Sequence, residues 1–395
     1  MKKPLIVQKF GGTSVGSIER IHQVAEHIIK AKNDGNQVVV VVSAMSGETN
    51  RLMELAKQVD SVPTARELDV LLSAGEQVSM ALLAMTLNKL GHAARSLTGA
   101  QANIVTDNHH NDATIKHIDT MTITELLEQD QIVIVAGFQG VNENGDITTL
   151  GRGGSDTSAV TLAGALQADE CQIFTDVDGI YTCDPRVVKD AQRLDIIDFP
   201  SMEAMASKGA KVLHLPSVQY AWQHNVPLRV LSTFDVNEGS LVKGESGSRP
   251  VAGIAIQRDL AIIHVDKEHL SGAMKQCQMI GIDIWNVIED ADRAGIMIKQ
   301  DARAKLELVF SDKIRNSEEV SLLTAVGLEA NGLVDHACDL LAESEIDINF
   351  CSTDALTMML VLLPEYVDQA ANILHDAYIT ASDTLNIQQK HAFLG

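Results

Sequence analysis

The sequence predicts an α/β protein, a three-layer sandwich around a mainly parallel sheet, followed by two smaller α+β units. Up to about residue 235, short apolar runs alternate with segments whose apolar residues recur every three or four positions. The runs are continuous, as in strands that helices bury on both faces. After residue 250, a strand–helix–strand–strand order occurs twice. With 395 residues, 45% of them hydrophobic, the chain can build more than one core.

The first part of the chain supplies the strands of the sheet and the helices that cover it. Helical spacing extends from Ile18 to Ile29 and through Leu68–Leu90. Apolar runs rich in valine and isoleucine predict strands at Leu5–Val7, Val38–Val42, Ile132–Ala136, Gln172–Phe174 and Leu228–Leu231. Because helices separate these strands, we expect most of them to run parallel.

The stretch Asn237–Pro250 is rich in Gly, Ser and charge, which predicts a linker and a domain boundary. Beyond it, the first copy of the repeat has strands at Ala261–Val265, Ile282–Val287 and Ala294–Ile298, and a helix at His269–Met279. The second copy has strands at Leu322–Val326, Ile346–Phe350 and Thr357–Leu363, and a helix at Val334–Ala342. In the first copy, the second helix and the last strand are compressed into Ala302–Phe310. We therefore expect a truncated first unit.

Composition excludes several classes of partner. Lys and Arg total 31 against 53 Asp and Glu, a formal net charge of -22, so the field of the chain repels phosphate backbones and anionic lipid. We expect no nucleic-acid and no membrane partner. The start of the chain has only three consecutive apolar residues, too few for a signal-peptide core, so we expect a cytoplasmic protein. Five cysteines without a C-x-x-C pair fit reduced thiols and indicate no zinc site.

KFGGTSVGS, at Lys9–Ser17, is a glycine-rich turn between a strand and a helix. It has the glycine spacing of a P-loop but lacks the Lys-Ser or Lys-Thr pair that should follow. Gly11-Gly12 allows backbone N–H groups to approach an anion, and the helix start directs its positive end the same way. Thr13-Ser14 adds hydroxyl donors, and Lys9 reaches the same space from the strand end. The alternative is an ordinary strand-to-helix turn.

Two further loops carry polar groups. In GRGGSD, at Gly151–Asp156, Ser155 is a good helix N-cap and Asp156 falls in the first turn. Arg152 suits bidentate recognition of a carboxylate or phosphate, whereas Asp156 could simply complement the helix dipole. IFTDVDGIYTCDPR, at Ile173–Arg186, follows a strand end, where ligands bind in parallel sheets. Its D-x-D-G start lacks the oxygen ligands that a calcium loop needs next.

VQKFGGTSV, at residues 7–15, resembles the signature of aspartate kinases in every position. SAMSGETN at 43–50, LLSAGE at 71–76, GRGGSD and TDVDGIYTCDPR are similar to other blocks of that family, in the same order. The resemblance covers residues 1–245 and implies a catalytic domain with the amino acid kinase fold. Residues 251–395 resemble a regulatory and dimerisation region of tandem ACT units, at about 260–315 and 320–395.

The resemblance implies roles for individual residues. ATP would be bound by Lys9, Gly11, Gly12, Thr13, Ser14, Thr175, Asp176, Tyr181, Arg186 and Lys211. L-Aspartate would be bound by Ser43, Thr49, Glu76, Arg152 and Ser155, with Glu76 on its ammonium and Arg152 on its α-carboxylate. Lys9 and Asp156 would be catalytic. From the residues alone, a solvated helix residue is the better interpretation of Glu76, and a surface lysine is an equal alternative for Lys211. Ser43 and Thr49 could be turn or cap residues, and Tyr181 could pack against the sheet.

The implied reaction transfers a phosphoryl group from ATP to the side-chain carboxylate of L-aspartate, the first step towards lysine, threonine and methionine. The acceptor has a reference pKa of about 3.9, so it is already ionised and needs no general base. We expect no catalytic histidine. Charge would be neutralised by Lys9, backbone donors and Mg2+, whose direct ligands the sequence does not assign.

The tail of the chain allows two roles, regulation by an amino acid and dimerisation. The tail departs from the family pattern in DKEHLSG and VGLEANGL, so lysine or threonine could be the effector, or the tail could only dimerise. We expect a homodimer or a higher homo-oligomer. The competing functions are a non-catalytic ACT amino-acid sensor and a kinase of the same fold that acts on acetylglutamate or UMP.

Overall fold

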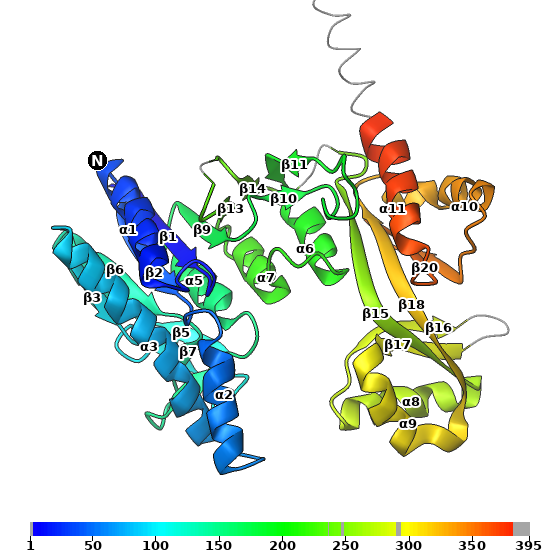
Figure 1. Ribbon diagram of the computed structural model, residues 1–395, viewed down its shortest axis with the longest axis horizontal. Helices are drawn as coiled ribbons and strands as arrows, with labels where there is room; N and C mark the ends of the chain where they lie inside the picture. Colours follow the sequence, from blue (N-terminus) through cyan, green and yellow to red (C-terminus); the bar gives the residue numbers. More distant parts are fainter. Residues whose placement is uncertain (1–2, 236, 246–248, 290–293, 382–395) are drawn as a thin grey trace, which may run out of the picture. The chain divides into compact units, whose positions relative to one another are not determined.

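The computed structural model describes residues 3–235, 237–245, 249–289 and 294–381. Contacts divide the chain into two compact units, which Figure 1 labels by element. The first unit contains Met1–Ile180, Arg193–Glu203 and Lys211–Ser246; the second contains Tyr181–Gln192, Ala204–Ala210 and Gly247–Gly395. The sequence-derived domain limits, 1–245 and 251–395, stay predictions.

An eight-stranded sheet forms the centre of the first unit, in the order β12-β14-β13-β9-β1-β2-β6-β3. All adjacent pairs for which the register is given run parallel except β13 with β14. The five predicted strands are confirmed within it. The strands are β1 (Leu5–Phe10), β2 (Gln37–Val42), β3 (Ala94–Leu97), β6 (Ile132–Ala136), β9 (Glu170–Thr175), β12 (Ile196–Ile197), β13 (Leu228–Ser232) and β14 (Ser240–Val242).

Helices cover both faces of this sheet, as continuous apolar strands require. Alternate strand residues, such as Val38 and Val40, pack in one core with α1 and α3, while Val39 and Val41 on the other face are also fully buried. α5 packs on β1, β2 and β9. The helices of this part of the chain are α1 (Ile18–Asn33), α2 (Glu48–Val59), α3 (Ala65–Lys89), α4 (Met121–Glu128), α5 (Gly154–Leu166), α6 (Phe199–Ser207) and α7 (Leu215–Gln223).

A second, four-stranded sheet lies in the first unit in the order β5-β4-β7-β8, and the sequence patterns did not predict it. Its strands are β4 (Ile104–Thr106), β5 (Ile115–Ile118), β7 (Gln139–Val141) and β8 (Ile147–Thr149). α3 packs along β8. Although α3 is long and apolar enough to cross a membrane by length and composition, half of its apolar window is buried in the fold. The short strands β10 (Ile180–Tyr181) and β11 (Arg193–Leu194) pair separately.

The second unit is built on a six-stranded sheet, ordered β16-β17-β15-β18-β20-β19, whose pairs are all antiparallel. Two strands of 13 residues, β15 and β18, pair with each other and belong to both halves of the sheet. The strands are β15 (Gly253–Val265), β16 (Ile284–Glu289), β17 (Ala294–Lys299), β18 (Ile314–Val326), β19 (Phe350–Thr353) and β20 (Thr357–Leu362).

Each half of this sheet has its own helix-covered core. One core packs α8 (Lys267–Met279) and α9 (Arg303–Phe310) on β15 and β17. The other packs α10 (Val334–Glu343) and α11 (Val367–His375) on β18 and β20. Two cores with matching element order are consistent with the predicted repeat. Short turns of helix occur at Gln300–Ala302, Ser311–Lys313, Ala330–Leu333 and Asp376–Thr380.

The prediction that the first of these units is truncated, with a helix and strand compressed into Ala302–Phe310, was wrong. Residues 303–310 are helical, and the missing strand is the first half of β18, from Ile314. That half reads IRNSEE and is at most half-buried, so its hydrophobic pattern does not predict a strand. Its pairing with β15 supplies the main-chain hydrogen bonds instead.

Two smaller predictions also fail. The expected linker contains β14, whose Val242 is fully buried between β12 and β13; a two-residue apolar run is too short to predict a strand. Residues 246–248 of that stretch, and 382–395 of the predicted second ACT unit, lie outside the described residues. The expected strand at Ile346–Phe350 begins only at Phe350, because Ile346 closes the end of α10 through its N–H to Leu341.

Candidate active site

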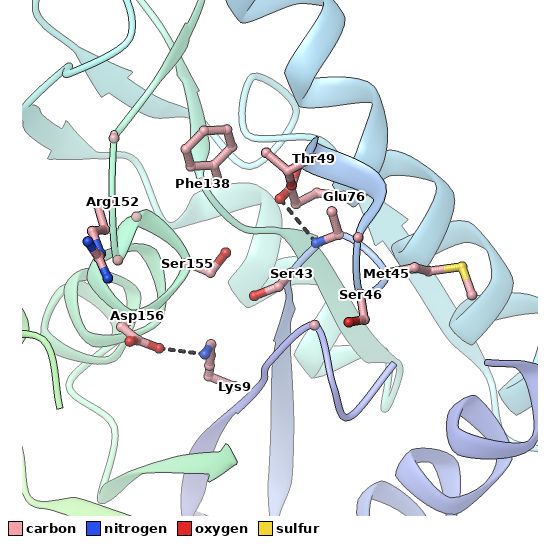
Figure 2. Close-up of a pocket in the computed structure, with 16 residues that line it drawn as sticks. Lys9, Ser43, Met45, Ser46, Thr49, Glu76, Phe138, Arg152, Ser155 and Asp156 are labelled. Atoms are coloured by element: carbon pink, nitrogen blue, oxygen red, sulfur yellow. Dashed lines mark hydrogen bonds and ion pairs between the residues drawn. The ribbon is translucent and has the colours of Figure 1, made fainter. Parts of the chain in front are cut away.

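A pocket of about 340 Å³ opens at the carboxyl ends of β1, β2 and β6, beside the start of α5. It brings together eight of the residues predicted for the site: Lys9, Gly12, Ser43, Thr49, Glu76, Arg152, Ser155 and Asp156. Figure 2 shows Arg152 and Glu76 on opposite sides of this pocket, with Ser43 and Ser155 between them. The remaining lining residues are Ala44, Met45, Ser46, Gly47, Phe138, Gly151, Gly153 and Gly154.

Lys9 and Asp156 form an ion pair on the pocket wall. Nζ of Lys9, near the end of β1, lies 2.6 Å from Oδ1 of Asp156, in the first turn of α5. Their side chains are only 11% and 18% exposed, so solvent screens the pair much less than a surface pair. The carboxylate also lies at the positive end of the helix dipole. The pair therefore presents a fixed ammonium group to the pocket.

The glycine-rich turn packs against the loop that follows β2. A Cβ at Gly12 would lie 2.9 Å from the carbonyl oxygen of Ala44, so only glycine fits without a shift. The carbonyl of Gly12 accepts a hydrogen bond from the N–H of Ser46 at 3.1 Å. At the far end of the turn, Ser17 caps α1 by accepting a hydrogen bond from the N–H of Arg20.

The hydroxyl residues of this turn lie away from the pocket lining. Ser14 is fully buried, and its Oγ is 2.6 Å from Oγ1 of Thr233 in a hydroxyl–hydroxyl hydrogen bond. Thr13 is exposed. Gly11 does not line the pocket, but a Cβ there would be 3.5 Å from Nζ of Lys9. The turn thus contributes one glycine and the adjacent Lys9 to the pocket itself.

Glu76 is a buried carboxylate with one satisfied and one unsatisfied oxygen. Its Oε1 accepts the N–H of Ala44 at 3.0 Å, while Oε2 is buried with no hydrogen-bond partner among the described residues. Burial raises the pKa of Glu76 to about 7, although the N–H groups of Glu76 and Ala44 oppose that rise. The preceding Gly75 allows this approach, because a Cβ there would lie 2.8 Å from Cβ of Ala44.

Arg152 lies on a turn that two left-handed glycines make possible. Gly151 and Gly153 have φ of 69° and 73°, a region in which glycine avoids the steric cost of a Cβ. Gly153 is the N-cap of α5, so the prediction of Ser155 as the cap was wrong and the helix begins before it. Arg152 is exposed and forms no ion pair or hydrogen bond with the described residues.

The remaining residues predicted for ATP do not line the pocket. Thr175 ends β9 and donates its hydroxyl to Oδ1 of the exposed Asp176, at 3.0 Å. Lys211 is exposed in the same unit. Tyr181 and Arg186 belong to the second unit, where Arg186 forms a two-point ion pair with Asp184.

Sequence reasoning missed two residues of this region. Phe138 lines the pocket with a φ of 66°, held by its N–H to Ser158 Oγ and by its carbonyl to the N–H of Leu150. The ring of His214 lies close to Gly153, since a Cβ at that glycine would be 2.4 Å from the ring. Burial lowers the pKa of His214, against the opposing effect of Asp156 and with a further lowering by Arg152. Both contacts come from distant segments, so local pattern could not reveal them.

The family model described as Amino acid kinase family matches residues 4–232, a range that contains the whole pocket. This match covers more than half of the chain. The chain is a member of the amino acid kinase family.

Relatives over nearly the full length are aspartokinases. The chain is 45% identical over 406 residues to an aspartate kinase of Pseudomonas putida, covering 95% of this chain and 97% of the relative. It is 45% identical over 404 residues to an aspartokinase of Pseudomonas aeruginosa, with the same coverage. For an aspartokinase of Helicobacter pylori the identity is 41% over 403 residues, covering 95% and 99%. Its place within the family is therefore with the aspartokinases.

Solved structures agree on the fold. Aspartokinase III of E. coli, in complex with aspartate and ADP, matches with a TM-score of 0.77 at 24% identity, over 94% of this chain and 99% of that one. An aspartate kinase from Synechocystis matches with a TM-score of 0.57 at 33% identity, over 95% and 69%. The predicted fold class, a parallel-sheet kinase domain followed by ACT-like units, is confirmed.

Proposed function

We propose that this protein is an aspartate kinase, which converts ATP and L-aspartate into ADP and 4-phospho-L-aspartate. Its membership of the aspartokinases supports a kinase that uses ATP. The observation that carries the choice of substrate is the buried, unpartnered Oε2 of Glu76, which faces Arg152 across the pocket. At one end of the site Glu76 therefore has no cationic partner, and at the other end Arg152 has no anionic partner among the described residues.

A free amino acid satisfies both ends. Its ammonium pairs with Glu76, and this ion pair offsets the free-energy cost of removing the carboxylate from water. Its α-carboxylate pairs with the guanidinium of Arg152, whose planar donors fit two oxygens at once. Ser43, Thr49 and Ser155 border the substrate between these two groups. An acetylated nitrogen carries no ammonium, so it would leave Glu76 unpaired.

The side-chain carboxylate of the bound aspartate attacks the terminal phosphorus of ATP, and ADP leaves. Because the nucleophile is already ionised, the principal barrier is the approach of one anion to another. Lys9 offsets that repulsion, and the N–H of Gly12 binds a phosphate oxygen beside it. The N–H of Gly11 donates to the carbonyl of Phe174 at 3.4 Å, so Gly11 contributes by the close approach of its backbone. Asp156 holds the ammonium of Lys9 in position through the 2.6 Å ion pair. No histidine takes part in the proton balance.

Mg2+ accompanies the nucleotide in this proposal. Among the described residues, no group of three or more His, Cys, Asp or Glu side chains is placed to hold a metal ion. Mg2+ usually keeps several waters and binds one or two carboxylates together with substrate phosphates. Asp156, on the pocket wall, is the carboxylate that fits this role. When bound, the ion neutralises charge on the transferred group.

The remainder of the nucleotide would be bound by Thr13, Ser14, Thr175, Asp176, Tyr181, Arg186 and Lys211. Their assignment follows from the family resemblance and not from the pocket geometry. Individual replacement of Lys211 and Arg186 tests it, because each should raise the KM for ATP without changing the KM for aspartate. An unchanged KM for ATP in both variants would remove these residues from the site.

The second unit would regulate the first and join two copies in a homodimer. Aspartokinase III of E. coli has been solved in complex with lysine and aspartate, which makes lysine the first effector to test here. A titration of activity with lysine, threonine and both together identifies the effector. Insensitivity to all three additions would leave the unit with only a dimerising role. Sedimentation at several protein concentrations determines the subunit number.

The experiment that tests the proposed function is an ADP-release assay with aspartate, glutamate, acetylglutamate and UMP as acceptors. We expect turnover with aspartate and much less with the others, together with formation of an acyl phosphate that hydroxylamine traps. A preference for acetylglutamate or UMP would make the protein a different kinase of this fold. Absence of turnover with all four would favour a non-catalytic amino-acid sensor.

A further inference from the structure

Asp69 is a fully buried carboxylate on α3 that the proposed reaction does not use. Its oxygens accept four hydrogen bonds from three residues. Oδ2 lies 2.6 Å from Nδ1 of His110, and Oδ1 accepts the hydroxyl of Thr149 at 2.5 Å. The N–H of Asn111 donates to both oxygens, at 3.0 and 3.2 Å. These donors compensate for the removal of the carboxylate from water.

The donors come from two segments, of which one, the end of β8, leads into the Arg152 turn. His110 and Asn111 lie on the loop between β4 and β5, and Thr149 ends β8, two residues before Gly151. The two segments also bind each other, because the N–H of Ala113 donates to the carbonyl of Thr149 at 2.9 Å. Asp69 therefore ties the segment that precedes the Arg152 turn to the loop between β4 and β5.

The loop between β4 and β5 also packs against Gly151, at the start of the Arg152 turn. A Cβ at Gly151 would lie 2.7 Å from Oδ1 of Asp112 and 3.2 Å from the carbonyl oxygen of Asn111. Asn111 has a φ of 68°, in the left-handed region that few residues other than glycine, asparagine and aspartate adopt. Its N–H is the donor that binds both oxygens of Asp69. The carboxylate thus stabilises the backbone shape on which Gly151 rests.

Helix α3 also carries Glu76, seven residues and about two helical turns after Asp69. We propose that Asp69 is a positioning residue that ties the Arg152 turn to the helix bearing Glu76, so that one rigid element sets the spacing between the two groups that recognise the substrate. This inference rests on the proposed function of Glu76 and Arg152. It makes Asp69 a determinant of affinity and of acceptor length, although it touches no substrate.

Asp69→Asn tests the inference, since an amide cannot accept hydrogen bonds at both of its terminal atoms. We expect the KM for aspartate to rise about tenfold or more, with the KM for ATP unchanged and kcat at saturating aspartate within about threefold. The ratio of kcat/KM for glutamate to that for aspartate should increase, because the spacing is no longer fixed. Asp119→Asn, an exposed carboxylate that binds the N–H of Met121 at the start of α4, is the matched control and should change none of these values.

His110 provides a second variant in case Asp69→Asn does not fold. His110→Ala removes one donor and should reproduce the rise in the KM for aspartate, whereas His110→Asn, whose amide can donate in the place of Nδ1, should restore most of it. Equal KM values for aspartate in the wild type and both His110 variants would overturn the inference. So would a parallel rise in the KM for ATP, which indicates a general loss of structure.

Hydrogen exchange separates this inference from the proposed function, because it needs no substrate. In Asp69→Asn and His110→Ala, the amides of 110–113 and 151–153 should exchange faster, while those of β1 and β2 keep their protection. If the wild type fails to phosphorylate aspartate, faster exchange at the Arg152 turn still supports the positioning role. Unchanged exchange at that turn contradicts it, whatever the activity.

Discussion

The two sheets of this protein organise their sequence in opposite ways. In the first unit each strand of the mainly parallel sheet occupies one position, and the carboxyl ends of β1, β2 and β6 lead into loops that line the pocket. In the second unit β15 and β18 each belong to two halves of an antiparallel sheet. Local motifs therefore locate the functional groups of the first unit. In the second unit the two repeats share β15 and β18, so no local motif marks where one repeat ends and the other begins.

Replacement of Lys9 gives the largest expected effect, and it tests whether a local motif of the first unit locates a functional group. Lys9→Ala should reduce kcat by about 100-fold or more, because the ammonium that neutralises the transferred charge is lost. The fold should persist, since the side chain lies at the pocket wall. Lys30→Ala, an exposed lysine paired with Asp34, is the control for loss of one positive charge. Turnover like that of the wild type in Lys9→Ala would remove Lys9 from the mechanism.

One leucine-to-alanine substitution in the core of each unit tests whether the two units unfold independently. Leu83 in the first core and Leu360 in the second are both fully buried, and each change to alanine should cost about 2–5 kcal/mol of stability. Hydrogen exchange should show the loss in β1, β2 and β6 for Leu83→Ala, and in β18 and β20 for Leu360→Ala. Loss of protection at the same amides in both variants would mean that the units unfold together.

The pH dependence of aspartate binding tests the buried carboxylate. Burial raises the pKa of Glu76 to about 7 in the free protein, and only the charged form pairs with an ammonium. Below pH 7 the KM for aspartate should therefore increase, approaching tenfold for each pH unit, whereas above it the KM should be constant. Glu76→Gln should raise the KM at neutral pH and abolish this dependence. A wild-type KM that stays constant from pH 8 to pH 5 would contradict the role of Glu76.

The helix caps give the smallest expected effect. Ser17→Ala should cost about 1 kcal/mol of stability because the side chain accepts the N–H of Arg20 at the start of α1. Ser155→Ala should cost less, since Gly153 caps α5 without a side-chain bond. Chemical denaturation of both variants measures the difference. An equal or larger loss for Ser155→Ala would show that Ser155 supports the helix start after all.

Much of the first unit follows from its sequence because its signals are local. The run QVVVVV predicts β2, and the glycines before Ser14 and Ser155 place two loops at the end of the sheet that holds Lys9. Parallel strands then bring these loops together without further information. This geometry explains why eight of the predicted site residues line one pocket.

The remainder depends on contacts between segments far apart in the chain. The left-handed backbone of Phe138, the ring of His214 on Gly153 and the hydrogen bonds of Asp69 each join distant segments. The polar first half of β18 is a strand only because β15 pairs with it. The hydrophobic pattern of one segment does not indicate which distant segment it contacts.

The most direct test of the account compares the turnover of aspartate with that of N-acetyl-aspartate, which keeps both carboxylates but has no ammonium. Because Glu76 would then be buried without a partner, kcat/KM for the acetylated substrate should be lower by about 100-fold or more. Glu76→Gln should reduce that difference. Comparable turnover of the two substrates by the wild-type protein would contradict the assignment of this pocket to a free amino acid.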